Sequence, residues 1–164
     1  MTARGSLKPP RWPASDAGVY CLLLDLPKRL LLKAGRLDGM TVEPGHVLYV
    51  GRARRNLFAR LGRHMRRRKP RRWHIDYLFP AAIPLGAFVF AGEPQTECEI
   101  AARLSRRRDV RRMIPGFGSS DCGCPGHLLW TPRAAVNGSA ASSGAAMVPP
   151  FHLAGSAFFQ ASAW

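Results

Sequence analysis

The sequence has few acidic residues: ten Asp and Glu stand against 25 Lys and Arg in 164 residues, a formal net charge of +15. With a pI near 11.3, the chain favours a polyanionic partner, and nucleic acid is preferred over an anionic membrane surface. The length fits one ordinary domain, at roughly 100–200 residues per domain. The composition therefore favours a single nucleic-acid-binding domain and excludes a multidomain machine.

Long apolar runs are also lacking. The segment before Ala17 contains prolines and cations but no apolar stretch that would serve as a signal peptide. The most apolar uncharged stretch, residues 77–92, carries Pro80 and Pro84 and falls short of the about 20 residues of a membrane span. We therefore expect a cytoplasmic protein without a membrane partner. With only four cysteines, we expect reduced thiols rather than a disulfide framework.

Composition divides the chain into three zones. Residues 1–15 are rich in proline and charge, lack periodicity and are interpreted as a disordered leader. Residues 133–164 are rich in Ala, Ser and Gly, and Arg133 is their only charge, so we expect this tail to be disordered too. The working domain is predicted to span residues 16–132.

Strand and helix signals alternate within this domain. Short apolar runs and alternating patterns predict extended segments at residues 18–24, 46–51, 73–79, 85–90 and 127–131. A further hairpin is expected between Leu30 and Val42. The predicted fold class is α/β (α+β), with a small, mainly antiparallel central sheet flanked by helices.

Two helices are predicted. The first starts at about Asn56, because Leu57, Leu61 and Met65 recur every four residues. The second runs from Thr96 to about residue 107, because Thr96 is followed three positions later by a glutamate, which is the capping-box pattern.

A dense basic block lies between Gly51 and Ile75, which holds eleven Lys or Arg and no acid. Arginine suits bidentate phosphate contacts, which give affinity without sequence selection. A solvated helix face is the alternative, but the lack of balancing acids favours nucleic acid, DNA before RNA. The predicted contacts are Arg52, Arg54, Arg55, Arg63, Arg67, Arg68, Lys69, Arg71 and Arg72.

Five residues offer the parts of a phosphodiester-hydrolysing site. Tyr20 and Tyr49 each lie in a strand that also carries a glycine two positions away. Arg60 and His64 are four apart on the first helix and share one face. Glu97 opens the second helix, whose positively polarised N-terminus favours a negative charge. Each residue alone is commonplace, but together they supply two phenols, a guanidinium, an imidazole and a carboxylate.

On these residues the chain resembles the GIY-YIG nuclease superfamily, through its Gly18-Val19-Tyr20 and Tyr49-Val50-Gly51 motifs and the helix and glutamate that follow. It is most similar to a small prokaryotic branch sometimes called Uri-type endonucleases, with which it shares stretches 73–77, 97–99 and 117–122. The resemblance covers about residues 17–130. It implies a three-stranded antiparallel sheet flanked by helices.

The resemblance also implies roles. Glu97 would bind one divalent cation, Mg²⁺ or Mn²⁺, which keeps most of its waters. Tyr20 or Tyr49 would accept a proton or position the attacking water, Arg60 would neutralise charge on the phosphate, and His64 would orient a tyrosine or relay its proton. An unperturbed tyrosine titrates near 10, so its use as a base requires the cation or Arg60 to lower its pKa.

The chain departs from the superfamily pattern in two ways. Tyr20 and Tyr49 are farther apart than in most members, which the predicted hairpin explains. Many members have an asparagine near the site, but neither asparagine of this chain is suitably placed. Ser119, Ser120 or Asp121 is the replacement that position suggests.

His74 and Asp76 alternate with Trp73, Ile75 and Tyr77, so on a strand both would point to one face. His74 then either fills the role of a second catalytic histidine found in homing-endonuclease members or makes a structural hydrogen bond to Asp76. The two interpretations carry equal weight.

Four residues are candidate zinc ligands: Cys98, Cys122, Cys124 and His127. The Cys-x-Cys-x-x-His spacing differs from paired Cys-x-x-Cys knuckles, so the signal is weak. Buried thiols that act as small hydrophobes are the preferred interpretation.

The leading hypothesis is thus a metal-dependent endonuclease acting on DNA, branched or damaged DNA included. The alternatives are a non-catalytic DNA- or RNA-binding module of the same fold and a zinc-stabilised interaction protein.

Overall fold

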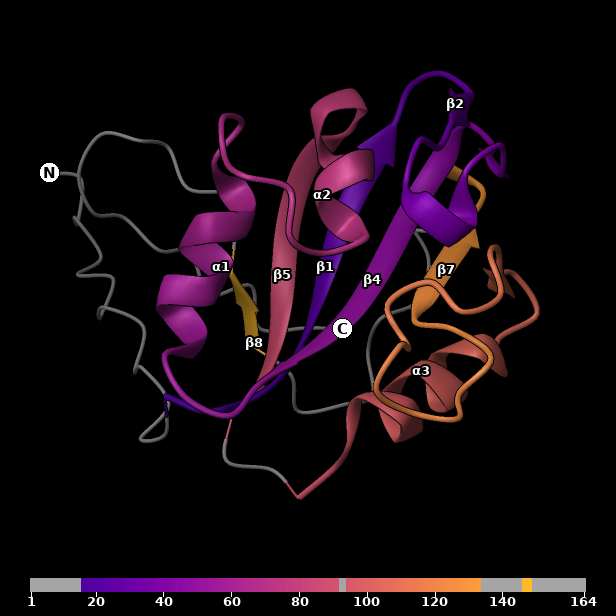
Figure 1. Cartoon of the computed structure of the whole chain (residues 1–164). Coiled ribbons are helices and arrows are strands. Elements are labelled where there is room, and N and C mark those ends of the chain that lie inside the picture. The colour runs from indigo at the N-terminus through magenta and orange to yellow at the C-terminus, as the bar shows by residue number, and fades with distance from the viewer. Residues whose placement is uncertain (1–15, 92–93, 134–145, 149–164) are drawn as a thin grey trace, which may run out of the picture.

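The computed structural model describes residues 16–91, 94–133 and 146–148 (Figure 1). Its centre is a six-stranded sheet of order β6-β7-β4-β1-β5-β8, and every neighbouring pair is antiparallel. The strands are β1 (Gly18–Leu26), β4 (Gly45–Ala53), β5 (Ile83–Ala91), β6 (Arg111–Arg112), β7 (Leu128–Thr131) and β8 (Ala146–Val148). The predicted fold class is confirmed, and the three central strands β4, β1 and β5 are extended by further strands on both sides.

Helices cover the sheet. They are α1 (Leu57–Met65), α2 (Ile75–Leu78) and α3 (Glu97–Ser105), with 3₁₀ turns η1 (Gly35–Leu37) and η2 (Phe79–Ala81). A separate hairpin pairs β2 (Leu30–Leu31) with β3 (Thr41–Val42), as the sequence predicts between residues 30 and 42. In Figure 1, α1 and α2 lie together beside β5 and β1, whereas α3 lies near β7.

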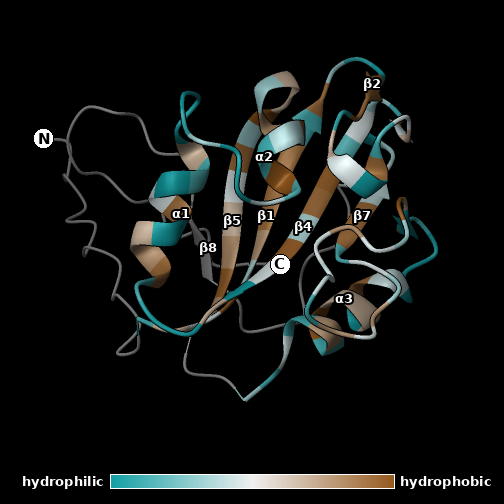
Figure 2. Ribbon diagram, in the orientation of Figure 1, coloured by the Kyte–Doolittle hydropathy of each residue, from teal (hydrophilic) through white to brown (hydrophobic). Residues whose placement is uncertain are grey.

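The side chains of β1 divide the core in two, because successive residues of a strand point to opposite faces. Tyr20, Leu22 and Leu24 belong to the larger cluster, to which α1 contributes Leu57 and Leu61. Val19 and Cys21 belong to the smaller cluster with Ile100 and Ala101 of α3. The apolar strands and the mixed colouring of α1 in Figure 2 follow this arrangement. Two layers of helix therefore enclose the sheet, and β1 touches both.

The start of α3 is fixed by the predicted capping box. The Glu99 backbone N–H donates to Thr96 Oγ1 at 3.2 Å, and the Thr96 N–H donates back to the Glu99 carboxylate at 2.7 Å. The capping box thus satisfies the backbone N–H groups of Thr96 and Glu99, which have no partner within the helix. Glu97, the first helical residue, is held at a defined point beside the sheet.

The extended segment predicted at residues 73–79 is wrong, because this stretch forms α2 and η2. The Asp76 carboxylate accepts hydrogen bonds from the backbone N–H groups of Arg72 and Trp73, at 2.9 and 3.1 Å. These bonds curl the chain into a helical turn and override the alternating pattern. Ile75 and Leu78, three residues apart, then lie buried in the core.

The tail prediction is wrong for residues 146–148, which form β8 against β5. The rest of the predicted tail after Arg133, like the predicted leader at residues 1–15, lies outside the described residues. Among the described residues, no helix is long and apolar enough to cross a membrane.

Candidate active site

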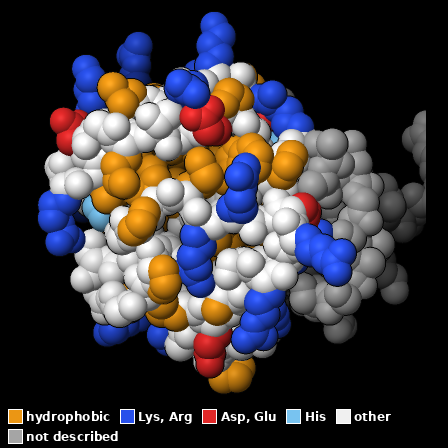
Figure 3. All heavy atoms as spheres, turned by 90° about the vertical axis from the view of Figure 1, so that its right-hand side faces the viewer, with side chains coloured by type: hydrophobic (Ala, Val, Ile, Leu, Met, Phe, Trp, Pro, Cys, Tyr) orange, Lys and Arg blue, Asp and Glu red, His pale blue; other side chains and the backbone are white. Residues whose placement is uncertain are grey.

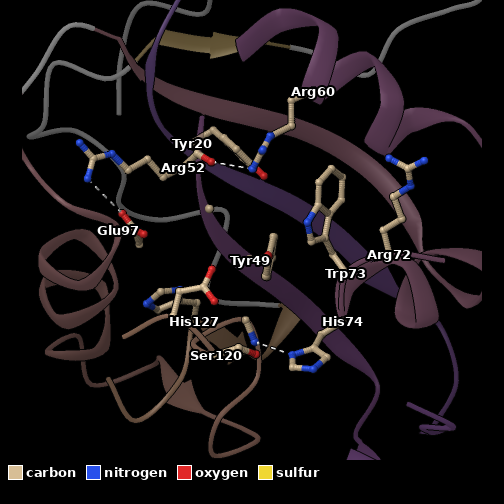
Figure 4. Close-up of a pocket in the computed structure, with 13 residues that line it drawn as sticks. Tyr20, Tyr49, Arg52, Arg60, Arg72, Trp73, His74, Glu97, Ser120 and His127 are labelled. Carbon is tan, nitrogen blue, oxygen red and sulfur yellow. Dashed lines mark hydrogen bonds and ion pairs between the residues drawn. The ribbon is translucent and has the colours of Figure 1, made fainter. Parts of the chain in front are cut away.

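Four elements (β1, β4, α1 and α3) and two loops converge on one pocket of about 310 Å³ (Figure 4). Four of the residues that the sequence analysis predicts as catalytic and the predicted metal ligand line it, whereas His64 lies behind its wall. The lining consists of Tyr20, Tyr49, Gly51, Arg52, Arg60, Arg72, Trp73, His74, Glu97, Gly118, Ser120, Asp121 and His127.

Tyr20 reaches the pocket by crossing the neighbouring strand at a glycine. In the sheet register Tyr20 pairs with Gly51. A Cβ at Gly51 would lie 2.5 Å from the Tyr20 hydroxyl and 2.6 Å from Cζ, which no side chain tolerates. The glycine of the second motif is therefore a packing requirement of the tyrosine of the first.

The Tyr20 hydroxyl lies 2.8 Å from Nε2 of His64, which is buried on α1. Burial lowers the pKa of His64 to about 3, so the imidazole is neutral at physiological pH. Burial also raises the pKa of Tyr20 to about 12, although the nearby Arg60 guanidinium acts in the opposite direction. Arg60 does act to lower the pKa of Tyr20, as expected, but burial raises that pKa by more, so the net shift is upward.

Tyr49 is packed against the loop before β7. The loop residue Gly118 has a φ of +72°, and a Cβ there would lie 2.7 Å from Tyr49 Cε2. The ring also meets Phe117 edge-on, at 6.0 Å between centroids. Burial raises the pKa of Tyr49 further than that of Tyr20, so both phenols are protonated in this state of the protein.

Arg60 is held at the mouth of the pocket. Its Nη1 donates to the Arg52 carbonyl at 2.7 Å, and its guanidinium lies 4.8 Å from the centroid of the Trp73 ring. Arg63, one turn further along α1, covers the same ring at 4.1 Å. These contacts fix the guanidinium while its remaining N–H groups face the Tyr20 side of the pocket.

Glu97 presents a carboxylate to the same pocket. Its Oε2 is buried without a hydrogen-bond partner among the described residues, and its closest cation, Nη1 of Arg52, is 4.0 Å away. An orphaned carboxylate oxygen is costly unless a ligand satisfies it. This donor fits a hard divalent cation, and the exposed carboxylate of Asp121 lines the pocket as well.

His74 takes neither of the two predicted arrangements in full. Its Nδ1 accepts the Gly118 backbone N–H at 2.9 Å, so there is no hydrogen bond to Asp76, and the ring lines the pocket. With Nδ1 accepting, a neutral imidazole carries its proton on Nε2. Of the three residues offered in place of the missing asparagine, Ser120 and Asp121 line the pocket and Ser119 is buried outside it.

Two cations of the basic block form ion pairs with a buried carboxylate of the protein itself. Arg63 Nη2 lies 3.0 Å and Lys69 Nζ 3.4 Å from the buried carboxylate of Asp76. Burial acts to raise the pKa of Asp76, but the Arg63 hydrogen bonds and two backbone N–H groups outweigh it and lower it to about 2. The sequence analysis missed this role, although Asp76 is the first acid after the block.

The other predicted contacts are all exposed, and two of them line the pocket. Arg52 and Arg72 line it, and both are exposed. The further exposed cations are Arg54, Arg55, Arg67, Arg68 and Arg71. In the space-filling view of the α3 and β7 side, Lys and Arg side chains are spread over the surface and acids are few (Figure 3).

A second group of side chains lies beside the pocket. Ligand atoms of Cys98, Cys122, Cys124 and His127 all lie within 4.8 Å of one another, which makes a cluster able to hold a metal ion. The structure pairs Cys98 with Cys124 as a disulfide, against the expectation of free thiols, whereas Cys21 and Cys122 are free. The signal for this cluster was present in the sequence as the predicted weak zinc set.

The chain is thus a small α+β domain with a cationic pocket that contains two phenols and a carboxylate. Its sequence matches a family described as a domain of unknown function, DUF123, over residues 19–147. The chain belongs to that family. No curated protein and no solved structure matches it.

Proposed function

We propose that the protein is a metal-dependent endonuclease of the GIY-YIG kind that hydrolyses phosphodiester bonds in DNA. The observation that carries the proposal is the convergence of Tyr20, Tyr49, Arg60 and Glu97, from four different elements, on one pocket, where a buried oxygen of Glu97 has no hydrogen-bond partner among the described residues and only a 4.0 Å ion pair with Arg52. Residues distant in sequence gather in this way when a site needs all of them.

Arg60 is proposed to bind the scissile phosphate. Its guanidinium is anchored by the Arg52 carbonyl and by the Trp73 ring, so little side-chain freedom is lost when a phosphate oxygen arrives. Donors that are already in position stabilise the negative charge that develops on the phosphate in the transition state. Removing one such donor typically slows a reaction by about 10²–10³-fold.

Tyr20 is proposed to hold the attacking water. Because its pKa is raised to about 12 and that of His64 is lowered to about 3, the proton stays on the phenol before substrate binds. His64 orients this hydroxyl through the 2.8 Å hydrogen bond and is itself shielded from solvent. Tyr20 thus acts as a positioning group for the water, and His64 as a positioning residue for Tyr20.

Glu97 is proposed to hold a divalent cation, Mg²⁺ or Mn²⁺, and Asp121 is near enough to the pocket to assist. Such a cation supplies electrostatic stabilisation of the leaving oxygen. Arg52, which lies 4.0 Å from Glu97, would then be free to contact a phosphate. The exposed arginines of the basic block would provide sequence-independent contacts to the flanking backbone.

The proposal is tested by incubating the full chain with supercoiled plasmid, branched DNA and structured RNA, each with Mg²⁺, Mn²⁺ or EDTA. Glu97→Ala is the blank, and Glu43→Ala, which removes an exposed carboxylate paired with Arg29, is the matched control. We expect cation-dependent cleavage of DNA by the wild type and by Glu43→Ala only. Tight DNA binding without cleavage would support the binding module instead, and cleavage that survives both EDTA and Glu97→Ala would indicate a contaminant.

A further inference from the structure

The four-residue cluster beside the pocket carries an inference that does not depend on nuclease activity. We infer that Cys98, Cys122, Cys124 and His127 form a structural zinc site that fastens the loop before β7 to the first turn of α3. Its donors, sulfur and imidazole nitrogen, differ from the carboxylate oxygen proposed to hold Mg²⁺, and of the four only His127 also lines the pocket.

The distances from the histidine support a tetrahedral metal. His127 Nε2 lies 3.6 Å from Cys98 Sγ and 3.7 Å from Cys122 Sγ. In a tetrahedral site with ordinary Zn–N and Zn–S bonds, adjacent nitrogen and sulfur ligands lie about 3.6 Å apart. The zinc site requires Cys98 and Cys124 as thiolates in place of the disulfide that pairs them in the structure, and Cys122, which is free, already contacts His127.

The surroundings of His127 have the features of a metal ligand. The ring is buried, and its Nε2 contacts the sulfurs of both Cys98 and Cys122. A buried imidazole whose nitrogen faces two thiols is placed as a metal ligand would be. Cys98 is the second residue of α3, where the helix N-terminus favours a thiolate, and the net charge of +15 favours thiolates in general.

The second half of the loop before β7 has little packing of its own. Residues 113–127 contain no helix or strand; Ile114 and Phe117 anchor the first half in the core, but from 119 to 125 only Ser119 is buried. That stretch buries no apolar side chain that would offset the entropy of ordering it. A metal bound through Cys122 and Cys124 would tie it to α3, as structural zinc orders segments of small domains.

The proposed zinc site would also stabilise the lining of the pocket. Cys98 follows Glu97 directly in the chain, and Ser120 and Asp121 precede Cys122, so the proposed ion would join two opposite parts of the lining. Loss of the ion would loosen Asp121 and the Gly118 contacts to Tyr49 and His74 while leaving the sheet in place. This statement about the pocket rests on the proposed function only where it concerns catalysis.

The test is metal analysis of the full chain, expressed without an affinity tag and purified under reducing conditions without chelator. We expect about one zinc per chain, and visible absorption from thiolate ligands when Co²⁺ replaces it. Cys122→Ser should lose the zinc, whereas His127→Cys should keep it, because thiolate is also a ligand. Cys21→Ala, which changes a buried free cysteine outside the cluster, is the control and should keep it as well.

Hydrogen exchange gives a second readout that does not require a variant to fold normally. In zinc-free wild type, the amides of residues 117–125 should exchange faster, while those of β1, β4 and β5 keep their protection. A wild type that contains no zinc and has a Cys98–Cys124 disulfide by mass spectrometry would overturn the inference. Zinc that remains in the Cys98→Ser/Cys124→Ser double variant would overturn it too, because the ion would then be adventitious.

Discussion

The hydroxyl of Tyr20 and Nε2 of His64 lie 2.8 Å apart, and both side chains are almost completely buried. A tyrosine on a strand and a histidine on a helix, 44 residues apart, thus form one polar pair inside the apolar core. Buried polar groups of this kind are retained at a cost unless both are satisfied. The pair is the most direct link between the sheet and the proposed chemistry.

Tyr20→Phe should keep the ring and lose only the hydroxyl. We expect cleavage to slow by about 10²–10³-fold, the usual effect of removing one preorganised hydrogen-bonding group. Stability should fall by about 1 kcal/mol, because His64 loses its buried partner. Single-turnover cleavage and urea unfolding measure the two effects, and unchanged cleavage would remove Tyr20 from the mechanism.

Gly51→Ala, on the neighbouring strand, should displace the Tyr20 side chain. The added Cβ would meet the Tyr20 ring and hydroxyl, so we expect a loss of stability of about 1–3 kcal/mol together with a loss of cleavage. Gly62→Ala on α1 is the matched control, because nothing lies within 4 Å of its Cβ. That helical substitution should stabilise the protein by about 0.5–1 kcal/mol. Thermal unfolding of both variants checks the pair.

Stability should fall with acid in two steps. The pKa of His64 is about 3 in the folded protein and near 6.5 when unfolded, so the unfolded state binds more protons as the pH falls below about 6.5. The pKa of Asp76 is about 2 in the folded protein and near 3.9 when unfolded, so its contribution is present above about pH 4 and is lost toward pH 2. Urea unfolding from pH 8 to pH 2 measures both slopes.

Two variants separate these steps. His64→Phe should flatten the slope between about pH 6.5 and pH 3, and Asp76→Asn should reduce stability at neutral pH and flatten the slope below about pH 4. A slope that is unchanged in both variants would contradict the assigned ionisation states.

DNA binding should depend on salt through the exposed arginines after α1. Replacing both Arg67 and Arg68 by alanine should lower the slope of log affinity against log salt by about 2, close to one for each lost phosphate contact. The double alanine variant of Arg106 and Arg108, which are exposed after α3, is the control with equal charge loss. Fluorescence anisotropy over a range of salt concentrations measures both, and equal slopes would show that the block is not the interface.

Much of the fold was predictable from local signals. Apolar runs predicted β1, β4 and β5, and the Thr96–Glu99 capping box predicted the start of α3. Residues 73–79 were predicted wrongly, because the backbone there follows the Asp76 hydrogen bonds and ion pairs rather than its own alternating pattern. The strand at 146–148 was missed because its pairing with β5 is nonlocal and its residues carry no strand signal.

The sequence indicated which residues would come together but not their electrostatics. Tyr20, Tyr49 and Glu97 line one pocket, whereas His64, selected by the same pattern, does not, and the catalytic roles stay a prediction. The engagement of Arg63 and Lys69 with Asp76, and the upward pKa shifts of both tyrosines, depend on burial, which only the folded chain reveals. The same holds for Cys98, whose approach to residues 122–127 depends on the packing of α3 beside β7.

Glu97 is proposed to act in the cleavage step and not in folding or in DNA binding. Single-turnover cleavage and DNA affinity of Glu97→Gln, compared with those of Glu43→Gln in Mg²⁺, test this role. We expect Glu97→Gln to bind DNA as tightly as the wild type and to cleave it at least about 10²-fold more slowly, whereas Glu43→Gln should be unchanged in both. Cleavage by Glu97→Gln at the wild-type rate would show that Glu97 has no part in the reaction.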